Sequence, residues 1–300
     1  MIPRWQQHDQ RAAFDPGRTI VWLASYPKSG NTWLRALLTA LIEAPQALDL
    51  DYLLGTPDAY DRHALDDHAG IDSSEFSLAE LRPYLAGFVR ELAADARPPR
   101  FIKTHSGYGD GTLFPADASA GAICVVRHPQ DVAPSLAHHE NSTLDAAIAR
   151  MADPAALIDH TPGRGSSVVA QELGSWSGNV AGWLEQQEIP LLLVRYEDLL
   201  DDAVCQLGRI AAFLGLGTTP ALLQAAVDAC AIERLREAER RSGFAEAPRA
   251  DRSFFRHGRT GSGKAALTPA QRQSISRTHG SLARQLGYDP DHDTMSDGAD

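Results

Sequence analysis

Hydrophobic residues follow two patterns along this chain: short apolar runs, and longer segments with apolar residues at helical spacing. Short runs rich in β-branched and large apolar residues predict buried strands at 19–24, 100–105, 121–127 and 190–195. Helical spacing predicts amphipathic helices at 32–42, 76–94, 130–139, 144–151, 168–187, 202–214, 220–230, 231–241 and 268–286. This alternation predicts one α/β domain with a central parallel sheet, helices on both faces, and ligands at the carboxyl ends of the strands.

Polar segments set the limits of this domain. Residues 1–17 predict a loosely held N-terminal arm, residues 18–288 the folded domain, and the Asp-rich residues 289–300 an acidic disordered tail. Within the domain, segments 45–75, 106–118 and 140–168 are rich in turn-forming residues, and the last of them predicts a lid.

The first predicted strand leads into a loop and then a helix, a P-loop-like arrangement that creates an anion site. The free N–H groups of the first helical turn and the positive end of the helix dipole converge where the loop closes. Lys28 adds a full positive charge, and Ser29 and Thr32 add hydroxyl donors. The loop therefore predicts binding of a phosphate-like group.

Polar side chains follow all four predicted strands. Lys28 follows the first strand, Lys103 and His105 the second, Arg127 the third and Tyr196 the fourth. Because the carboxyl ends of parallel strands meet at one edge of the sheet, we expect these residues to share one crevice.

Composition narrows the choice of ligand and compartment. A content of 43% hydrophobic and 22% charged residues is that of an ordinary globular protein, and a formal charge of −11 argues against a nucleic-acid binder. An anionic ligand must therefore meet a local cluster of positive charge. The three cysteines lack metal-ligand spacing and predict free thiols, and no signal peptide or membrane-spanning apolar run is visible. We expect a cytoplasmic protein that uses no metal and binds no membrane.

Three longer segments match the motifs of one family, in that family's order. Residues 25–33 (SYPKSGNTW) resemble the 5′-phosphosulfate loop TYPKSGTTW of cytosolic-type sulfotransferases. Residues 127–135 (RHPQDVAPS) resemble their 3′-phosphate motif RxxRDxxxS, and residues 256–268 (RHGRTGSGKAALT) their C-terminal RKGxxGDWKxxLT. The stretches KTH at 103–105 and YED at 196–198 match two further elements. The chain thus resembles the PAPS-dependent sulfotransferases, in a bacterial-like form.

This resemblance implies 3′-phosphoadenosine 5′-phosphosulfate (PAPS) as the donor and PAP as the product. The 5′ end would bind the loop residues Lys28, Ser29, Gly30, Asn31, Thr32 and Trp33, with the Trp33 ring offered to the adenine. The 3′-phosphate would be held by Arg127 and Ser135, and covered by Arg256, His257 and Gly258. Tyr196 and residues 230–235 would line the base pocket.

The resemblance also assigns catalytic roles. Lys28 and Lys103 would stabilise the leaving phosphate, and His105 would remove the proton of the acceptor hydroxyl. Such a base contributes about 100- to 10,000-fold in rate, so His105→Ala should nearly silence turnover and spare donor binding. A structural role for His105 stays open, because the chain has four rival bases: His63, His68, His138 and His139.

Four departures from the family pattern bear on these roles. Asn31 replaces a Thr of the loop, and Gln130 replaces the second Arg of RxxRD, which removes a positive charge near the 3′-phosphate and leaves the donor affinity open. Ser262 and Gly263 replace Asp-Trp. The family's dimer signature KxxxTVxxxE falls on residues 264–273 and matches only in part, so a homodimer stays open.

Other functions fit parts of the pattern. A nucleotide-dependent small-molecule kinase or another P-loop NTPase would share the strand–loop–helix, but its Walker loop GxxxxGK[ST] places Lys after Gly, whereas Lys28 precedes Gly30. A silent PAPS-binding relative would bind the nucleotide and transfer nothing. Segments 45–75, 106–118 and 140–168 should form the acceptor pocket, for a small phenol, alcohol or natural-product hydroxyl. The sequence does not identify the acceptor.

Overall fold

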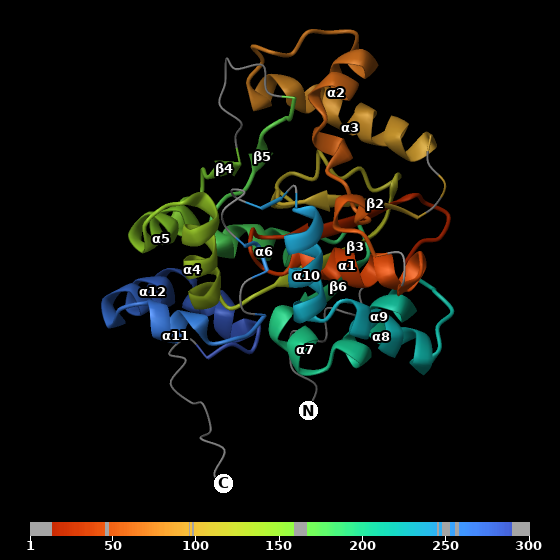
Figure 1. Ribbon diagram of the computed structural model, residues 1–300. Coiled ribbons are helices and arrows are strands. Elements are labelled where there is room, and N and C mark those ends of the chain that lie inside the picture. Colours follow the sequence, from red (N-terminus) through yellow and green to blue (C-terminus); the bar gives the residue numbers. More distant parts are fainter. Residues whose placement is uncertain are drawn as a thin grey trace.

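A four-stranded parallel sheet forms the centre of the fold in the computed structural model, which describes residues 14–45, 48–95, 97, 99–158, 167–244, 246–247, 253–255 and 258–289. The strand order is β2-β1-β3-β6 (Figure 1). The strands are β1 Ile20–Ser25, β2 Arg100–Thr104, β3 Ser119–Val126 and β6 Leu191–Arg195. The predicted strands and the parallel α/β fold are confirmed.

Helices surround this sheet. Their bounds are α1 Asn31–Ile42, α2 Arg62–Ala69, α3 Leu78–Ala94, α4 Pro129–Glu140, α5 Leu144–Ala152, α6 Trp176–Glu185, α7 Tyr196–Asp201, α8 Ala203–Phe213, α9 Pro220–Ala229, α10 Ile232–Ser242, α11 Ser262–Ala266 and α12 Pro269–Gln285. Two 3₁₀ turns, η3 Leu50–Tyr52 and η4 Asp58–Tyr60, and a short antiparallel pair, β4 Leu157–Ile158 with β5 Gln171–Glu172, complete the described elements.

The two faces of the sheet bury separate hydrophobic cores. Alternate side chains of β1 point to opposite faces: Val21 and Leu23 join one core, Trp22 and Ala24 the other. Helices α1, α8 and α9 cover the first face, and α3, α4, α6 and α12 the second (Figure 1). Because both faces are covered, every residue of β1 and β3 is buried, which explains their continuous apolar sequence.

One predicted helix begins later than expected. The prediction of helix over 168–187 is wrong before residue 176, because the chain at 171–172 is extended and pairs with β4. Gly174 has a positive φ of 64°, and the Ser175 side chain accepts from the Gly178 N–H as the helix cap. Val169 and Leu173 lie in this non-helical segment and are both buried in the core. Their spacing of four residues therefore suggested a helix that does not form.

The two ends of the chain fall mostly outside the described residues. Residues 1–13 of the predicted arm and 290–300 of the predicted tail are not among them. The final predicted helix is confirmed: Thr268 and Gln271 form a reciprocal capping box, and Pro269 occupies its first position. In the described part of the chain, no helix is both long and apolar enough to cross a membrane.

Candidate active site

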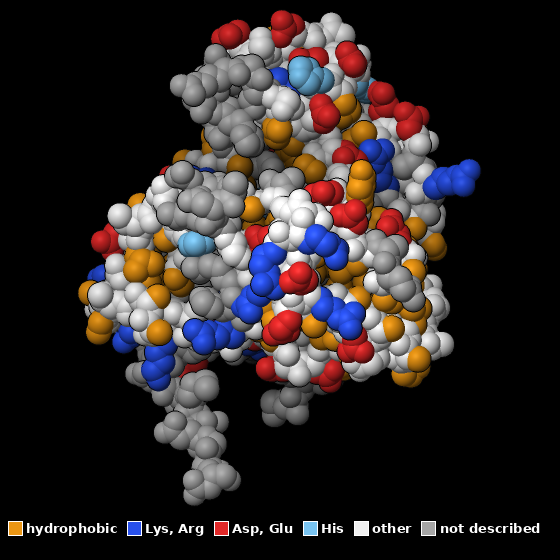
Figure 2. Space-filling view, in the orientation of Figure 1, with side chains coloured by type: hydrophobic (Ala, Val, Ile, Leu, Met, Phe, Trp, Pro, Cys, Tyr) orange, Lys and Arg blue, Asp and Glu red, His pale blue; other side chains and the backbone are white. Residues whose placement is uncertain are grey.

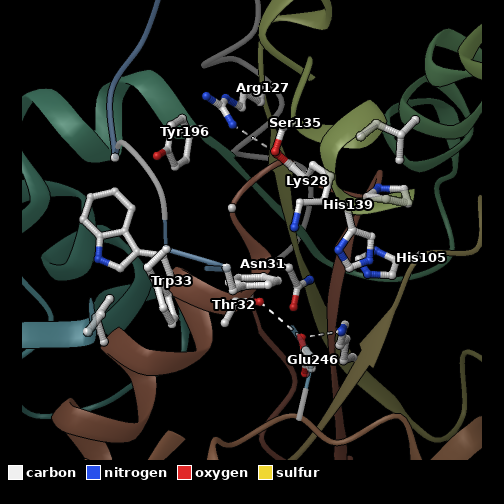
Figure 3. A pocket seen from close by; sticks show the side chains of 18 of the residues that line it. Lys28, Asn31, Thr32, Trp33, His105, Arg127, Ser135, His139, Tyr196 and Glu246 are labelled. Carbon is white, nitrogen blue, oxygen red and sulfur yellow. Dashed lines mark hydrogen bonds and ion pairs between the residues drawn. The ribbon is translucent and has the colours of Figure 1, made fainter. Parts of the chain in front are cut away.

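The carboxyl ends of the four strands open into one cavity of about 1050 Å³. Most of the predicted site residues line it: Lys28, Gly30, Asn31, Thr32, Trp33, Lys103, His105, Arg127, Ser135, Tyr196 and Gly258. Ser29 is fully buried beside it, whereas Arg256 and His257 lie outside the described residues. In Figure 3, Arg127 and Tyr196 lie on one side of Lys28, and His105 and Glu246 on the other. The cavity therefore has two polar ends.

The loop between β1 and α1 is held in a conformation suited to anions. Lys28 has a φ of 67° and Gly30 a φ of 109°, and a Cβ at position 30 would lie 2.6 Å from the Tyr196 ring. The Asn31 amide donates to the Leu23 carbonyl (2.9 Å) and the Ser25 hydroxyl (3.2 Å), which ties the helix start to β1. No side chain caps α1 and its own first turn carries no acidic residue, which leaves its N-terminal N–H groups and the positive end of its dipole available to an anion.

Two buried donors at the loop end have no hydrogen-bond partner among the described residues. They are the Ser29 hydroxyl and the Nε of Arg127. The other guanidinium nitrogens of Arg127 donate to the carbonyls of Lys28 (3.3 Å) and Arg259 (3.2 Å), and its Cζ lies 4.5 Å from the Tyr196 ring centroid. Buried donors without partners are costly, so this end of the cavity is built to receive an acceptor-rich group.

An aromatic wall lies next to this end. The Trp33 indole donates to the Cys230 carbonyl (3.2 Å), and the Trp33 and Tyr196 rings meet edge to face with centroids 5.8 Å apart. Ile232 and Leu235, at the start of α10, line the same part of the cavity. The wall offers flat apolar surfaces of the kind that a purine ring packs against.

His105 is oriented by its neighbours at the end of β2. Its Nδ1 lies 2.8 Å from the Ser25 carbonyl, which can only accept, so Nδ1 carries the proton and Nε2 is the atom that can take one up. The Asn179 amide and the Gln171 side chain hold the backbone of His105. Burial lowers the pKa of His105 to about 3, with nearby Lys103 acting in the same direction. The imidazole is therefore neutral at physiological pH, as a general base must be.

A carboxylate that the sequence patterns did not single out lies at the same end. Glu246, from the segment between α10 and α11, pairs with Lys103 Nζ (3.0 Å) and Arg35, and accepts from the Thr32 hydroxyl (3.3 Å). Burial raises the pKa of Glu246, but Lys103 and Arg35 outweigh it and bring the pKa to about 2. The Thr32 hydroxyl thus donates to Glu246, whereas we expected it to donate to the 5′-phosphosulfate.

Among the rival histidines, one shares the cavity. His139 on α4 lines it, and burial together with Lys28 and Lys103 lowers the pKa of His139 to about 4. His63, His68 and His138 are not among the described residues that line the cavity, and His68 pairs with Glu91 on α3.

The departures from the family pattern have structural reasons. Gln130 is buried and donates to Ser276 of α12 (3.3 Å), and it is not among the described residues that line the cavity. A Cβ at Gly263 would lie 2.4 Å from the Gln130 carbonyl oxygen, which excludes any larger residue there. The buried Asp131 accepts from the N–H groups of Gly261 (2.8 Å) and Gly263 (2.7 Å), and so fixes this loop against α4.

The predicted acceptor segments contribute unequally to the cavity. Segment 45–75 contributes Pro57, and segment 140–168 contributes Glu140, Arg150, Leu157, Ile158 and Val168. None of the described residues of 106–118 lines it, because this loop packs on β5 and α6 instead, with Gly107 donating to the Glu172 carbonyl (2.9 Å). On the face shown in Figure 2, Lys and Arg side chains gather around α10 and are mixed with acidic side chains.

Comparisons with known proteins identify one family. Residues 18–287 match the sulfotransferase domain family. Cytosolic sulfotransferase 7 of Arabidopsis thaliana is 25% identical over 273 residues, covering 87% of this chain and 78% of that protein. Flavonol 3-sulfotransferase of Flaveria bidentis is 26% identical over 271 residues, covering 86% and 79%.

Solved structures show the same fold. Mouse sulfotransferase SULT7A1 complexed with PAP superposes with a TM-score of 0.59 at 22% identity, over 93% of this chain and 88% of that one. Retinol dehydratase in a complex with retinol and PAP gives 0.58 at 20% identity, over 95% and 86%.

Proposed function

Because the chain belongs to the sulfotransferase domain family, we propose that it transfers a sulfuryl group from PAPS to a hydroxyl group of a small-molecule acceptor and releases PAP. The observation that carries this proposal is a pair of buried donors, Ser29 Oγ and Arg127 Nε, next to an aromatic wall. Neither donor has a hydrogen-bond partner in the part of the chain that the structure describes. PAPS has two anionic ends and a purine, which suit these features.

Donor binding would use two polar parts of the cavity, the loop 28–33 and the side chains of Arg127 and Ser135. The loop 28–33 would hold the 5′-phosphosulfate with its N–H groups, the Ser29 hydroxyl and the Lys28 ammonium group. Arg127 would hold the 3′-phosphate as a fork, with Ser135 as hydroxyl donor and Arg256, His257 and Gly258 covering it. Trp33 and Tyr196 would flank the adenine.

In the transfer step, a bond forms between sulfur and the acceptor oxygen, and the bond between sulfur and the oxygen of the 5′-phosphate breaks. The acceptor proton goes to Nε2 of His105, whose Nδ1–H donates to the Ser25 carbonyl. Lys28 and Lys103 stabilise the negative charge that the leaving phosphate gains. The chemistry needs positioning and charge stabilisation more than covalent help from the protein, by analogy with phosphoryl transfer.

The acceptor would enter on the side of His105. The cavity lining includes the apolar residues Leu136, Leu157, Ile158, Val168 and Phe254, which suits a phenol, an alcohol or another natural-product hydroxyl. Similar proteins include one solved with retinol and one named for flavonols. As part of this proposal the protein acts in the cytoplasm, like the relatives named cytosolic sulfotransferases.

Calorimetric titration with PAP, without added metal, tests donor binding, and labelled PAPS with a library of hydroxyl compounds tests transfer. We expect PAP to bind and at least one hydroxyl compound to become labelled. Mg²⁺-dependent ATP hydrolysis without PAP binding would overturn the proposal in favour of a kinase or NTPase. PAP binding without transfer to any acceptor would overturn it in favour of a silent nucleotide-binding relative.

A further inference from the structure

We propose that Glu246 is a positioning residue of the active site, which fixes the Lys103 ammonium group through a direct ion pair and ties it to the first turn of α1. The proposal rests on the proposed sulfuryl transfer for the role of Lys103. Its geometric basis, three contacts from one carboxylate, is independent of that role.

The two oxygens of Glu246 have different tasks. Oε1 pairs with Arg35, whose side chain is only 6% exposed and donates through Nε to the Leu54 carbonyl (2.8 Å). Arg35 is therefore a rigid anchor within α1. Oε2 contacts Lys103 Nζ (3.0 Å) and the Thr32 hydroxyl (3.3 Å), so it faces the groups that line the cavity.

This arrangement connects three separate parts of the chain. Lys103 comes from β2, Thr32 and Arg35 from α1, and Glu246 from the segment between α10 and α11. In Figure 3, Glu246 lies below Thr32, and a dashed line joins the two side chains. A lysine side chain has four rotatable bonds, so a fixed partner removes the cost of ordering it at the moment of transfer.

Glu246 also supplies the negative charge that Lys103 needs. Burial lowers the pKa of Lys103, and Glu246 opposes this effect. The other charged or titratable groups around Lys103 are Arg35 on α1, Lys28 in the loop, His105 at the end of β2 and His139 on α4. All of these are cationic or become so on protonation. Among the described residues, Glu246 is the acidic side chain that pairs with Lys103.

Removing this charge should therefore change the titration of Lys103. Glu246→Gln keeps the size of the side chain and removes its charge, Glu246→Asp keeps the charge, and Glu172→Gln breaks a matched pair with Arg82 (2.6 Å) at the surface. Competitive acetylation of the intact protein between pH 7 and 11, quantified at Lys103 by mass spectrometry, reports its protonation.

We expect Lys103 in Glu246→Gln to become about tenfold more reactive at a pH below its titration midpoint, which corresponds to a fall of about one pH unit in that midpoint. Glu246→Asp should restore much of the wild-type midpoint, and Glu172→Gln should not move it. An unchanged Lys103 midpoint in folded Glu246→Gln would overturn the proposal.

Turnover with PAPS gives a second readout. In Glu246→Gln the loss of kcat should grow as the pH rises from 7 to 9, because Lys103 loses its proton at lower pH than in the wild type. The KM for PAPS should not rise, since the lost carboxylate was a negative charge beside an anionic donor. Equal loss of kcat at every pH, or loss of PAP binding, would overturn the positioning role. If the wild-type protein binds no PAP, the proposed function fails, but the acetylation result still decides the Glu246–Lys103 link.

Discussion

Replacement of His105 by alanine tests the proposed chemistry most directly. The imidazole is buried, its Nδ1–H is committed to the Ser25 carbonyl at 2.8 Å, and its Nε2 is left to receive the acceptor proton. Loss of a positioned base costs about 100- to 10,000-fold in rate, or roughly 3–5 kcal/mol of transition-state stabilisation. The Ser25 carbonyl also loses a partner, which costs about 1–3 kcal/mol of folding free energy.

The pH dependence of the wild-type rate follows from the same contacts. Burial lowers the pKa of His105 to about 3, so the proton-accepting form persists as the pH falls and is lost only near that value. The acid limb of kcat/KM, which reports the free enzyme, should therefore lie well below the ordinary histidine pKa of about 6.5. Bound PAPS brings negative charge that favours the imidazolium, so the acid limb of kcat should lie at higher pH than that of kcat/KM.

The assay measures initial rates with labelled PAPS from pH 4 to 9, together with PAP affinity by calorimetry. His105→Ala should lose turnover and keep PAP affinity, because His105 lies on the far side of Lys28 from Arg127. His139→Ala is the matched control, since it removes a histidine from the same cavity wall. A His105→Ala protein with near wild-type rate, or a large loss in His139→Ala alone, would refute the assignment of the base.

Three further substitutions probe the donor end and its support. Arg127→Ala should weaken PAP binding about 10- to 100-fold through lost charge-assisted bonds, while AMP, which lacks the 3′-phosphate, binds as before; equal loss for both would contradict this. Gly30→Ala should lower the melting temperature and abolish PAP binding, because its φ is 109° and its Cβ would meet the Tyr196 ring at 2.6 Å; unchanged melting would contradict it. Asp131→Ala should cost about 2 kcal/mol or more in urea unfolding, since it leaves the N–H groups of Gly261 and Gly263 without their acceptor. A cost below about 0.5 kcal/mol would contradict this.

Local patterns in the sequence determined the elements that carry the site. A strand buried on both faces needs a continuous apolar run, so such runs marked β1, β3 and β6 without reference to the rest of the chain. β2 lies at the edge of the sheet, and its run is shorter, with Arg100 and Lys103 only partly buried. A strand followed by a tight loop with Lys28 and Gly30 and then by a helix marked the anion loop. Parallel strands bring their carboxyl ends to one edge, which placed Lys28, His105 and Arg127 in one cavity.

Tertiary structure alone decided which distant groups complete these elements. Glu246 and Lys103 are 143 positions apart in the sequence, and Asp131 and Gly263 are 132 apart. The local hydrophobic pattern around these residues does not indicate either contact. The segment before α6 is extended because β4 offers it a partner, although its apolar spacing favours a helix. One physical reason explains the ion pair, the loop contact and the strand pairing. Hydrophobic spacing indicates which side of an element is buried, whereas each of these contacts depends on which distant segment packs next to that element.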